Sequence, residues 1–398
     1  MNVKQFLAIL SAGDATMTLI VKGYTEGLGE GMQASAIADL VTRYSQLAAR
    51  RKPELIDAGS FKLGESAGDK LDGGEFGTMI AEWKALELEM RWVKAMLPQN
   101  QRDAYFQLVE HPILALSNLY HLYYAVAWNR RLAEANDPRA NVFADRAEAA
   151  FRRDHEITNA YHALNGGKWD GMMLQTHIGY TYWQEPRQQV MPEVKRVPSN
   201  GAAPTVVFLP VSTSLRIARQ QDVIAIEAPH YARAVGGKGL TWHTIPHLGR
   251  TLGAVTAFPQ GRAPTTVQDG VHLEYDVTLK KRGDLAVQLI MAPTLDPTGK
   301  GTLQIGLSVD GGAVQTLTDR LTPAPNETVT QEQRDWNQAV EDNARVLRAG
   351  FPGIEAGRHV VKVWRLDGNV VLQKLVISHG PIPPTYLGPA ETEPFHSN

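Results

Sequence analysis

Apolar residues in the first half of the chain recur at three- and four-residue spacing, which is typical of helices with one buried face. The pattern predicts a helix over 36–48, a second over 79–97 and a third over 102–135. Because proline lacks an amide hydrogen and clashes with the preceding turn, we expect Pro112 to kink or split the third helix. The stretch 60–77 is rich in glycine and charge and is expected to be a loop.

A fourth helix is predicted over 139–163. Asp137-Pro138 is a good start signal, because aspartate caps free amide groups and proline suits the first helical position. Gly166-Gly167 is expected to end it. The residues expected to face inward are Phe143, Ala147, Phe151, Ile157 and Tyr161. Long helices with short connections indicate a helical bundle.

The period of the apolar residues changes from 3.6 to 2 in the second half of the chain. Alternating apolar positions predict strands over 271–279, 285–291 and 303–309, each with one buried face. Residues 358–366 and 370–377 are a candidate hairpin around Asp367-Gly368-Asn369. One helix, about 331–349, is expected to interrupt the strands. Many short strands between glycine and proline turns indicate a β-sandwich.

The expected fold class is therefore α+β multidomain, with an α-helical bundle followed by a C-terminal β-sandwich that is jelly-roll-like and resembles carbohydrate-binding modules. An N-terminal segment, 1–34, precedes the bundle, which spans 35–197. A connecting segment over 198–222 is expected to lead to the β-sandwich at 223–380, and an extended tail occupies 381–398.

Composition excludes several classes of function. The 398 residues carry a net charge of −2, so no basic field is present to hold a polyanion, and nucleic acid is not an expected partner. The absence of cysteine excludes disulfides, thiolate metal sites and cysteine nucleophiles. No apolar run is long enough to span a bilayer, so no membrane association is expected. The short apolar run Phe6–Leu10 only weakly resembles a signal peptide, and localisation stays open.

The segment 165–192 holds the densest set of candidate site residues. Flat aromatic rings stack on the C–H faces of sugars, while amides and imidazoles reach their hydroxyl groups. The alternative is a long loop held on the bundle by its own aromatic side chains, and the residues by themselves favour it, because large aromatic side chains mostly pack. The candidates for binding a substrate, or for facing another domain, are Lys168, Trp169, Gln175, Thr176, His177, Tyr180, Tyr182 and Trp183.

No metal site, cofactor site or catalytic set follows from the sequence. His155-Glu156 lacks the second histidine of a zinc motif, so no metal ligand and no cofactor are assigned. The stretch 224–231 resembles the opening strand of carbohydrate-binding sandwich modules, in which two acids supply a calcium site. Here Pro229 stands at the position of the second acid and leaves Glu227 by itself, and a plain edge strand explains the stretch as well. No pair of carboxylates stands out for glycoside cleavage, so the catalytic residues are unknown.

Several phrases of the sequence together resemble glycoside hydrolase family 115, the xylan α-1,2-glucuronidases. They occur in the order that the family shows and span nearly the whole chain after residue 35, whereas 1–34 matches poorly. The chain departs from the family at Pro229 and at Asp367-Gly368-Asn369, where the family usually shows Asp-Pro-Gly. The phrases are RYSQLAARRKPELID (43–57), RDAYFQLVEHP (102–112), NGGKWDGMMLQTHIGYTYWQEP (165–186), IEAPHY (226–231), HTIPHLGRT (243–251), LEYDV (273–277), APTLD (292–296), VVLQKLVI (370–377) and PTYLGPAE (384–391).

The resemblance implies a glycoside hydrolase context in which glucuronic acid, or its 4-O-methyl form, is removed from xylan with inversion. Family members carry a (β/α)-barrel with the catalytic carboxylates before the helical and β domains, and no such barrel pattern occurs here. The expectation is a C-terminal fragment that is not catalytic by itself. The alternative is a stand-alone carbohydrate-binding or interaction protein that acts with a separate catalytic subunit. Implied partners are xylan or glucuronoxylan oligosaccharides, a homodimer, or the missing barrel, in a periplasmic or secreted setting.

Overall fold

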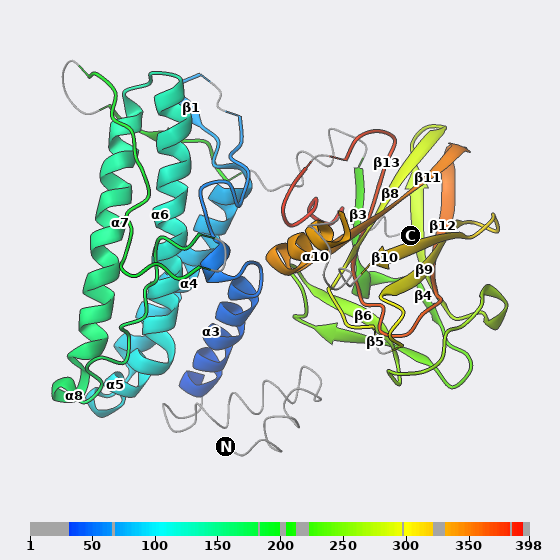
Figure 1. The fold of residues 1–398 in the computed structure, drawn as a ribbon, viewed down its shortest axis with the longest axis horizontal. Helices are drawn as coiled ribbons and strands as arrows, with labels where there is room; N and C mark the ends of the chain where they lie inside the picture. The colour runs from blue at the N-terminus through cyan, green and yellow to red at the C-terminus, as the bar shows by residue number, and fades with distance from the viewer. Residues whose placement is uncertain are drawn as a thin grey trace. The chain divides into compact units, whose positions relative to one another are not determined.

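The computed structural model describes residues 32–65, 68–181, 184–199, 204–211, 223–296, 298–320, 331–382 and 384–392, with the backbone alone at 32–33 and 331–336. The chain divides into two compact units, Met1–Thr213 and Ser214–Asn398. The first unit is helical and the second consists of β-strands with one helix (Figure 1). This order confirms the fold class predicted from the change of period along the sequence.

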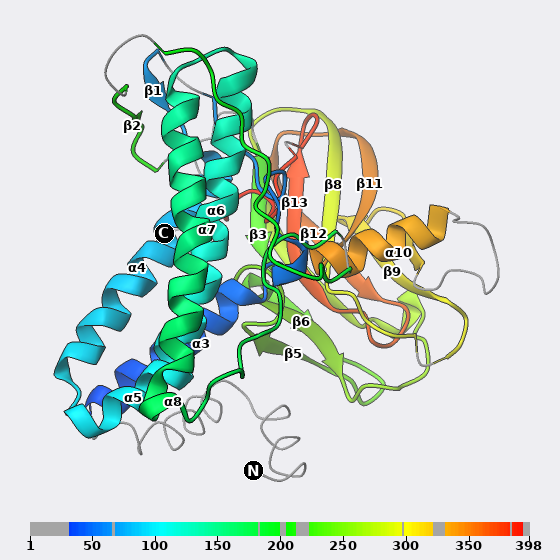
Figure 2. The same ribbon diagram turned by 60° about the vertical axis from the view of Figure 1, so that its left-hand side comes forward.

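The helical unit is arranged around α6 (His111–Glu134), which packs against both α7 (Arg139–His162) and α4 (Gly74–Met96). Helix α3 (Met32–Ala48) packs against α4. The long helices α6 and α7 lie side by side in both views (Figures 1 and 2). Aspartate 137 starts α7 as predicted, because the Arg139 amide donates to its Oδ1 at 2.9 Å.

Large aromatic side chains form much of the interior of this unit. Trp83 of α4 and Tyr120 of α6 are fully buried, and their ring centroids lie 5.3 Å apart. Trp128 of α6 stacks on Phe143 of α7 at 5.9 Å. Such rings remove large apolar areas from water, and truncating one to alanine typically costs about 3–5 kcal/mol. The helices are therefore held by tertiary packing rather than by their intrinsic propensity.

The start of α4 and the burial of Phe151 differ from the sequence prediction, whereas the split of the third helix near Pro112 was expected. Helix α4 already starts at Gly74, inside the stretch expected to be a loop, and Asp72 Oδ1 accepts the Gly74 amide at 2.9 Å. The third predicted helix is split into α5 (Arg102–Tyr105), a π-helical turn (Phe106–Glu110) and α6, since Pro112 has no amide to donate back. Phe151, expected to face inward, is only half-buried.

Near the N-terminus of α4, Lys70–Leu71 (β1) pairs in parallel with Val207–Phe208 (β2). Phe208 packs on Tyr124 and Phe143 at ring-centroid distances of 6.1 Å each, so this short pairing fixes the 204–211 segment on the bundle. A short helical turn, α8 (Leu164–Gly167), follows α7, and its Asn165 and Gly166 have left-handed φ values of 52° and 68°. The expected stop at Gly166-Gly167 is thus present.

The β unit is a sandwich of two sheets in which neighbouring strands run antiparallel. One sheet has the order β10-β9-β12-β7-β4, and the other has the order β11-β8-β13-β6-β5, with β3 on β13 (Figure 2). The first comprises β4 (Arg233–Val235), β7 (His272–Leu279), β9 (Thr302–Val309), β10 (Gln315–Arg320) and β12 (Gly357–Arg365). The second comprises β3 (Val223–Glu227), β5 (Thr241–Pro246), β6 (Gly253–Phe258), β8 (Gly283–Met291), β11 (Arg345–Ile354) and β13 (Leu372–Ser378).

The alternating residues predicted to be buried do form the core between the two sheets. Leu273 and Tyr275 of β7 belong to the same apolar cluster as Leu289 of β8 and Leu307 of β9. Since side chains alternate across a strand, the remaining positions of β7 face away from the core. The Tyr275 hydroxyl, fully buried, donates to the Ala228 carbonyl at 2.9 Å.

Two β-unit predictions are wrong in detail. Residues 358–366 and 370–377 do not form a hairpin, because β12 pairs with β7 and β9 while β13 pairs with β3, β6 and β8 in the other sheet. The Asp367-Gly368-Asn369 turn therefore carries the chain between sheets, as in other sandwiches. The predicted helix 331–349 is shorter: α10 (Gln331–Asp342) is followed by β11.

Among the described helices, none is both long enough and apolar enough to cross a membrane. The predicted signal-peptide-like run Phe6–Leu10 lies outside the described residues.

Candidate functional site

The segment that follows α7 is a long loop anchored at its middle. Ile178 is 1% exposed and its carbonyl accepts the Val190 amide at 3.1 Å. Gly179 has a φ of +100°, and a Cβ there would lie 2.6 Å from Val190 Cβ, so only glycine permits this approach. The two arms of the loop are thereby held against each other.

A buried carboxylate connects this loop to helix α7. Asp154, 6% exposed, contacts His177 Nδ1 at 3.2 Å through Oδ2 and accepts from Gln189 Nε2 at 3.0 Å. Gln189 Oε1 in turn accepts from the His177 and Ile178 amides at 3.0 and 2.7 Å. One glutamine side chain therefore ties both arms of the loop to the helix. A buried charge is tolerated in this position because hydrogen-bond donors surround it.

The other predicted site residues lie around this anchor without converging on one point. Thr176 Oγ1 donates to the Pro186 carbonyl at 2.9 Å, and Gln175 Nε2 donates to the Tyr180 hydroxyl at 3.1 Å. Lys168 lies over the Trp169 ring at 5.0 Å. Tyr182 and Trp183 lie outside the described residues. The described candidates mostly contact one another or the bundle, which fits the structural alternative as well as a binding surface.

Histidine 111 completes the polar surroundings of Asp154 and was not singled out by the sequence. Its ring lies 4.6 Å from that of Tyr161 and is 7% exposed. Burial, helped by the nearby His177 and opposed by Asp154, lowers the pKa of His111 to about 4. His111 Nε2 has no hydrogen-bond partner. The arrangement favours a neutral imidazole at neutral pH.

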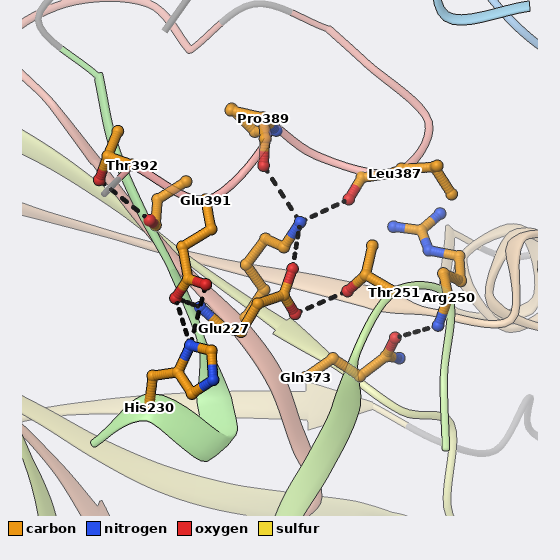
Figure 3. A network of polar contacts seen from close by, with 11 residues as sticks. Glu227, His230, Arg250, Thr251, Gln373, Leu387, Pro389, Glu391 and Thr392 are labelled. Carbon is orange, nitrogen blue, oxygen red and sulfur yellow. Dashed lines mark hydrogen bonds and ion pairs between the residues drawn. The ribbon is translucent and has the colours of Figure 1, made fainter. Parts of the chain in front are cut away.

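The β unit contains a second buried polar network, centred on Glu227 (Figure 3). Lys374 Nζ lies 2.9 Å from Glu227 Oε1 and also donates to the carbonyls of Leu387 and Pro389 at 3.3 and 3.1 Å. Thr251 Oγ1 donates to Glu227 Oε2 at 2.7 Å. All three hydrogens of the ammonium thus have an oxygen partner, which a buried ion requires.

This network corrects the expectation that Glu227 stands by itself. Pro229 lies in the 3₁₀ turn Ala228–His230 after the strand, and the cation beside Glu227 is a lysine ammonium supplied by β13. Within the described part of the chain, no group of three or more histidine, aspartate or glutamate side chains is arranged to hold a metal ion. The sequence could not show this pairing, because Lys374 is distant in the chain and lies in an apolar strand pattern.

The same network fastens the C-terminal segment to the sandwich. Glu391 accepts from the Glu227 amide at 2.9 Å and contacts His230 Nδ1 at 2.8 Å. Thr392 donates its amide to the Ala225 carbonyl at 2.9 Å. Arg250 lies over the Tyr386 ring at 4.6 Å, and its amide donates to Gln373 (Figure 3). Residues 384–392 form neither helix nor strand and are held by side chains of several strands.

A third charged cluster occupies the outer face of the five-stranded sheet. Glu274 accepts a paired contact from Arg233 at 2.8 and 2.7 Å and also contacts His272 and Lys362. The Arg233 guanidinium, with His272 and Lys362, holds the pKa of Glu274 at about 2. The His272 ring lies 4.4 Å from that of Trp364. Glu274 therefore remains ionised and engaged, and it is not placed to transfer a proton near neutral pH.

Comparison with known proteins identifies the β unit. Residues 218–391 match the family model described as the glycosyl hydrolase family 115 C-terminal domain. No curated protein sequence matches the chain. The structure is similar to that of BtGH115A, described as a family GH115 4-O-methyl-α-glucuronidase with specificity for decorated arabinogalactans. The TM-score is 0.64 at 16% identity, over 94% of this chain and 43% of that chain, so the likeness shows a shared fold.

Two further solved structures align with less than half of this chain. A GH26-CBM35 β-(1,4)-mannanase from Podospora anserina aligns at 15% identity over 41% of this chain and 28% of that chain, with a TM-score of 0.27. A family 35 carbohydrate-binding module from Clostridium thermocellum aligns at 14% identity over 39% of this chain and 97% of that chain, also with a TM-score of 0.27.

Proposed function

We propose, from the match of residues 218–391 to the glycosyl hydrolase family 115 C-terminal domain, that this chain supplies the helical and β regions of an α-glucuronidase. The substrate class is a polysaccharide bearing glucuronic or 4-O-methylglucuronic acid, with xylan as the backbone. The chain does not cleave the glycosidic bond by itself. The observation that carries the proposal is the family match, supported by the shared fold over 94% of this chain.

The chemistry of glycoside cleavage supports a non-catalytic role for these units. An inverting enzyme needs an acid and a base on opposite sides of the bond, with carboxyl groups about 6.5–9.5 Å apart. Each buried carboxylate of the described residues is instead engaged by a donor or cation of its own unit. These contacts are Glu87 with Ser117 and Arg91, Glu110 with Lys94, Asp154 with His177, Glu227 with Lys374, Glu274 with Arg233, Asp319 with Arg345, and Asp367 with the Gln304 amide.

The test is complementation. The purified chain is incubated with glucuronoxylan oligosaccharides, alone and together with a separately produced family 115 catalytic barrel, and released glucuronic acid is quantified. The proposal predicts no release by the chain and a gain in the barrel's activity or stability when both are present. Release by the chain without the barrel would overturn it.

A second candidate function, an interaction protein that acts with a separate catalytic subunit, is favoured by an apolar stripe on α4. Leu88, Trp92 and Met96 are spaced four residues apart on one helix face and are 60%, 62% and 38% exposed. Exposed apolar patches of this kind mark interaction surfaces. The Trp92→Glu substitution is expected to abolish co-purification with the barrel, whereas Leu295→Glu, at an 83% exposed position of the β unit, serves as the control. Equal co-purification of both variants would count against the stripe.

A further inference from the structure

A groove of about 710 Å³ lies in the helical unit, away from the anchored loop. Helices α4 and α7 both pack on α6, and the groove runs between them with α6 as its floor. Phe208 of β2 and the next residue, Leu209, also line it. Its volume falls in the range of small-molecule sites, roughly 300–1,000 Å³.

The side chains that line this groove include more cations than carboxylates. Lys84, Arg91, Arg146 and Arg153 are cationic, and Glu87 is the single carboxylate among the lining residues. Glu87 is already saturated: Ser117 Oγ donates to it at 2.5 Å, Arg91 contacts it at 3.0 Å and Arg153 at 3.4 Å. Lys84 and Arg146 have no ion-pair partner within the described ranges. The groove therefore presents uncompensated positive charge to any occupant.

The floor of the groove also carries two polar side chains, Asn118 and His121. Asn118 is 1% exposed; its Nδ2 donates to the Ala150 carbonyl at 2.8 Å, while its Oδ1 has no partner. His121 Nδ1 lies 2.8 Å from the Ser117 carbonyl, which can only accept, so Nδ1 carries the proton. Burial lowers the pKa of His121, which leaves Nε2 as an acceptor. Both residues line the groove between apolar walls that include Leu88 and Phe208. The ring of the fully buried Phe143 is covered by the Arg146 guanidinium, 4.9 Å from its centroid.

We propose that this groove binds a carboxylate-bearing saccharide. Lys84 and Arg146 receive the carboxylate, the His121 imidazole accepts from a sugar hydroxyl, and the apolar walls cover the C–H faces of the rings. The requirement for an organic anion follows from the groove itself, whereas the choice of a saccharide rests on the proposed function. Among the described residues that line the groove, Glu87 is the one carboxylate and it is already engaged, so we assign binding and not hydrolysis.

Calorimetry with the whole chain tests this assignment. The probes are 4-O-methylglucuronoxylotriose, neutral xylotriose and benzoate, each titrated at low and high salt. We expect heat with the acidic oligosaccharide, none with xylotriose, and an affinity that falls about tenfold at high salt because exposed charges are screened. Binding of benzoate but not of the acidic sugar would overturn the saccharide assignment, and no binding of either would overturn the site.

Substitutions of residues that line the groove test whether the acidic oligosaccharide binds there. Arg146→Gln and Lys84→Gln should each weaken affinity by about tenfold or more. Arg152→Gln, an exposed arginine on the same helix that does not line the groove, should change it less than about twofold. Ala149→Trp fills the groove from an exposed lining position and should abolish binding, with the exposed Ala160→Trp as its control. Unchanged binding in Ala149→Trp would overturn the proposal, while complementation by the barrel would still test the proposed function separately.

Discussion

The ammonium of Lys374 lies 2.9 Å from the carboxylate of Glu227, and the two side chains are 3% and 8% exposed. This pair joins β13 to β3 and, through the Leu387 and Pro389 carbonyls, to the C-terminal segment. A buried pair of this kind often adds little net stability compared with an apolar pair, yet the loss of one partner strands a charge. We therefore expect the contribution of this pair to the free energy of unfolding to become apparent when one of its two partners is removed.

Lys374→Met is expected to lower the free energy of unfolding by about 3–5 kcal/mol, because Glu227 remains buried without its cation. The double variant Lys374→Met/Glu227→Gln should recover part of this loss, since the charge is then removed. Calorimetric or urea unfolding measures both. The control is Arg282→Met, which breaks the exposed Arg282–Glu355 pair and should cost less than about 1 kcal/mol. Equal losses in Lys374→Met and Arg282→Met would contradict the account.

The anchored loop makes a second prediction. Gln189→Leu removes the acceptor for the His177 and Ile178 amides and the donor to Asp154, so the loop arms should separate. Trypsin cleavage after the exposed Arg187 should then become faster. Gln184→Leu, at an exposed position in the same loop, should leave the rate near that of the parent chain. A cleavage rate that is the same in both variants would show that the Gln189 bridge does not hold the loop.

The third prediction concerns pH. The pKa of His111 is about 4 in the folded chain, below the value of about 6.5 expected for an unfolded histidine, so the unfolded state binds the proton more readily. The stability linked to His111 is complete above about pH 6.5 and is lost as the pH falls towards 4. His121, whose pKa is also lowered by burial, acts in the same direction.

His111→Phe keeps a ring beside Tyr161 and removes the titrating group. We expect urea midpoints that depend less on pH between 6.5 and 4 than those of the parent chain. His155→Phe, at an exposed position of α7, is the control and should retain the parent slope. If the urea midpoint of His111→Phe changes with pH as steeply as that of the parent chain, a group other than His111 is responsible for the pH dependence.

Much of the fold was predictable because its periodicities are local. Helix α7 and strands β7, β8 and β9 are found within a residue or two of their predicted ranges. The 358–377 hairpin was wrong because alternation shows that a strand has a buried face but not which sheet it joins. The turn residues Asp367-Gly368-Asn369 serve a crossing between sheets as well as a hairpin.

The contacts of the candidate site could not be predicted from the sequence, because the residues that meet there lie far apart along the chain. His177 was identified by composition, but its partners Asp154 and Gln189 belong to a helix and to the far arm of the loop. The groove gave no signal, because Lys84 and Arg146 read as ordinary solvated charges on amphipathic helices. Only packing on α6 brings these cations to the two walls of one groove.

The central claim is that these two units do not cleave glycosidic bonds by themselves. The direct measurement is the release of 4-O-methylglucuronic acid from glucuronoxylan and from decorated arabinogalactan oligosaccharides by the purified chain, followed over long incubation. We predict no release above the uncatalysed background from either substrate. Sustained turnover that scales with the concentration of the chain would contradict the central claim.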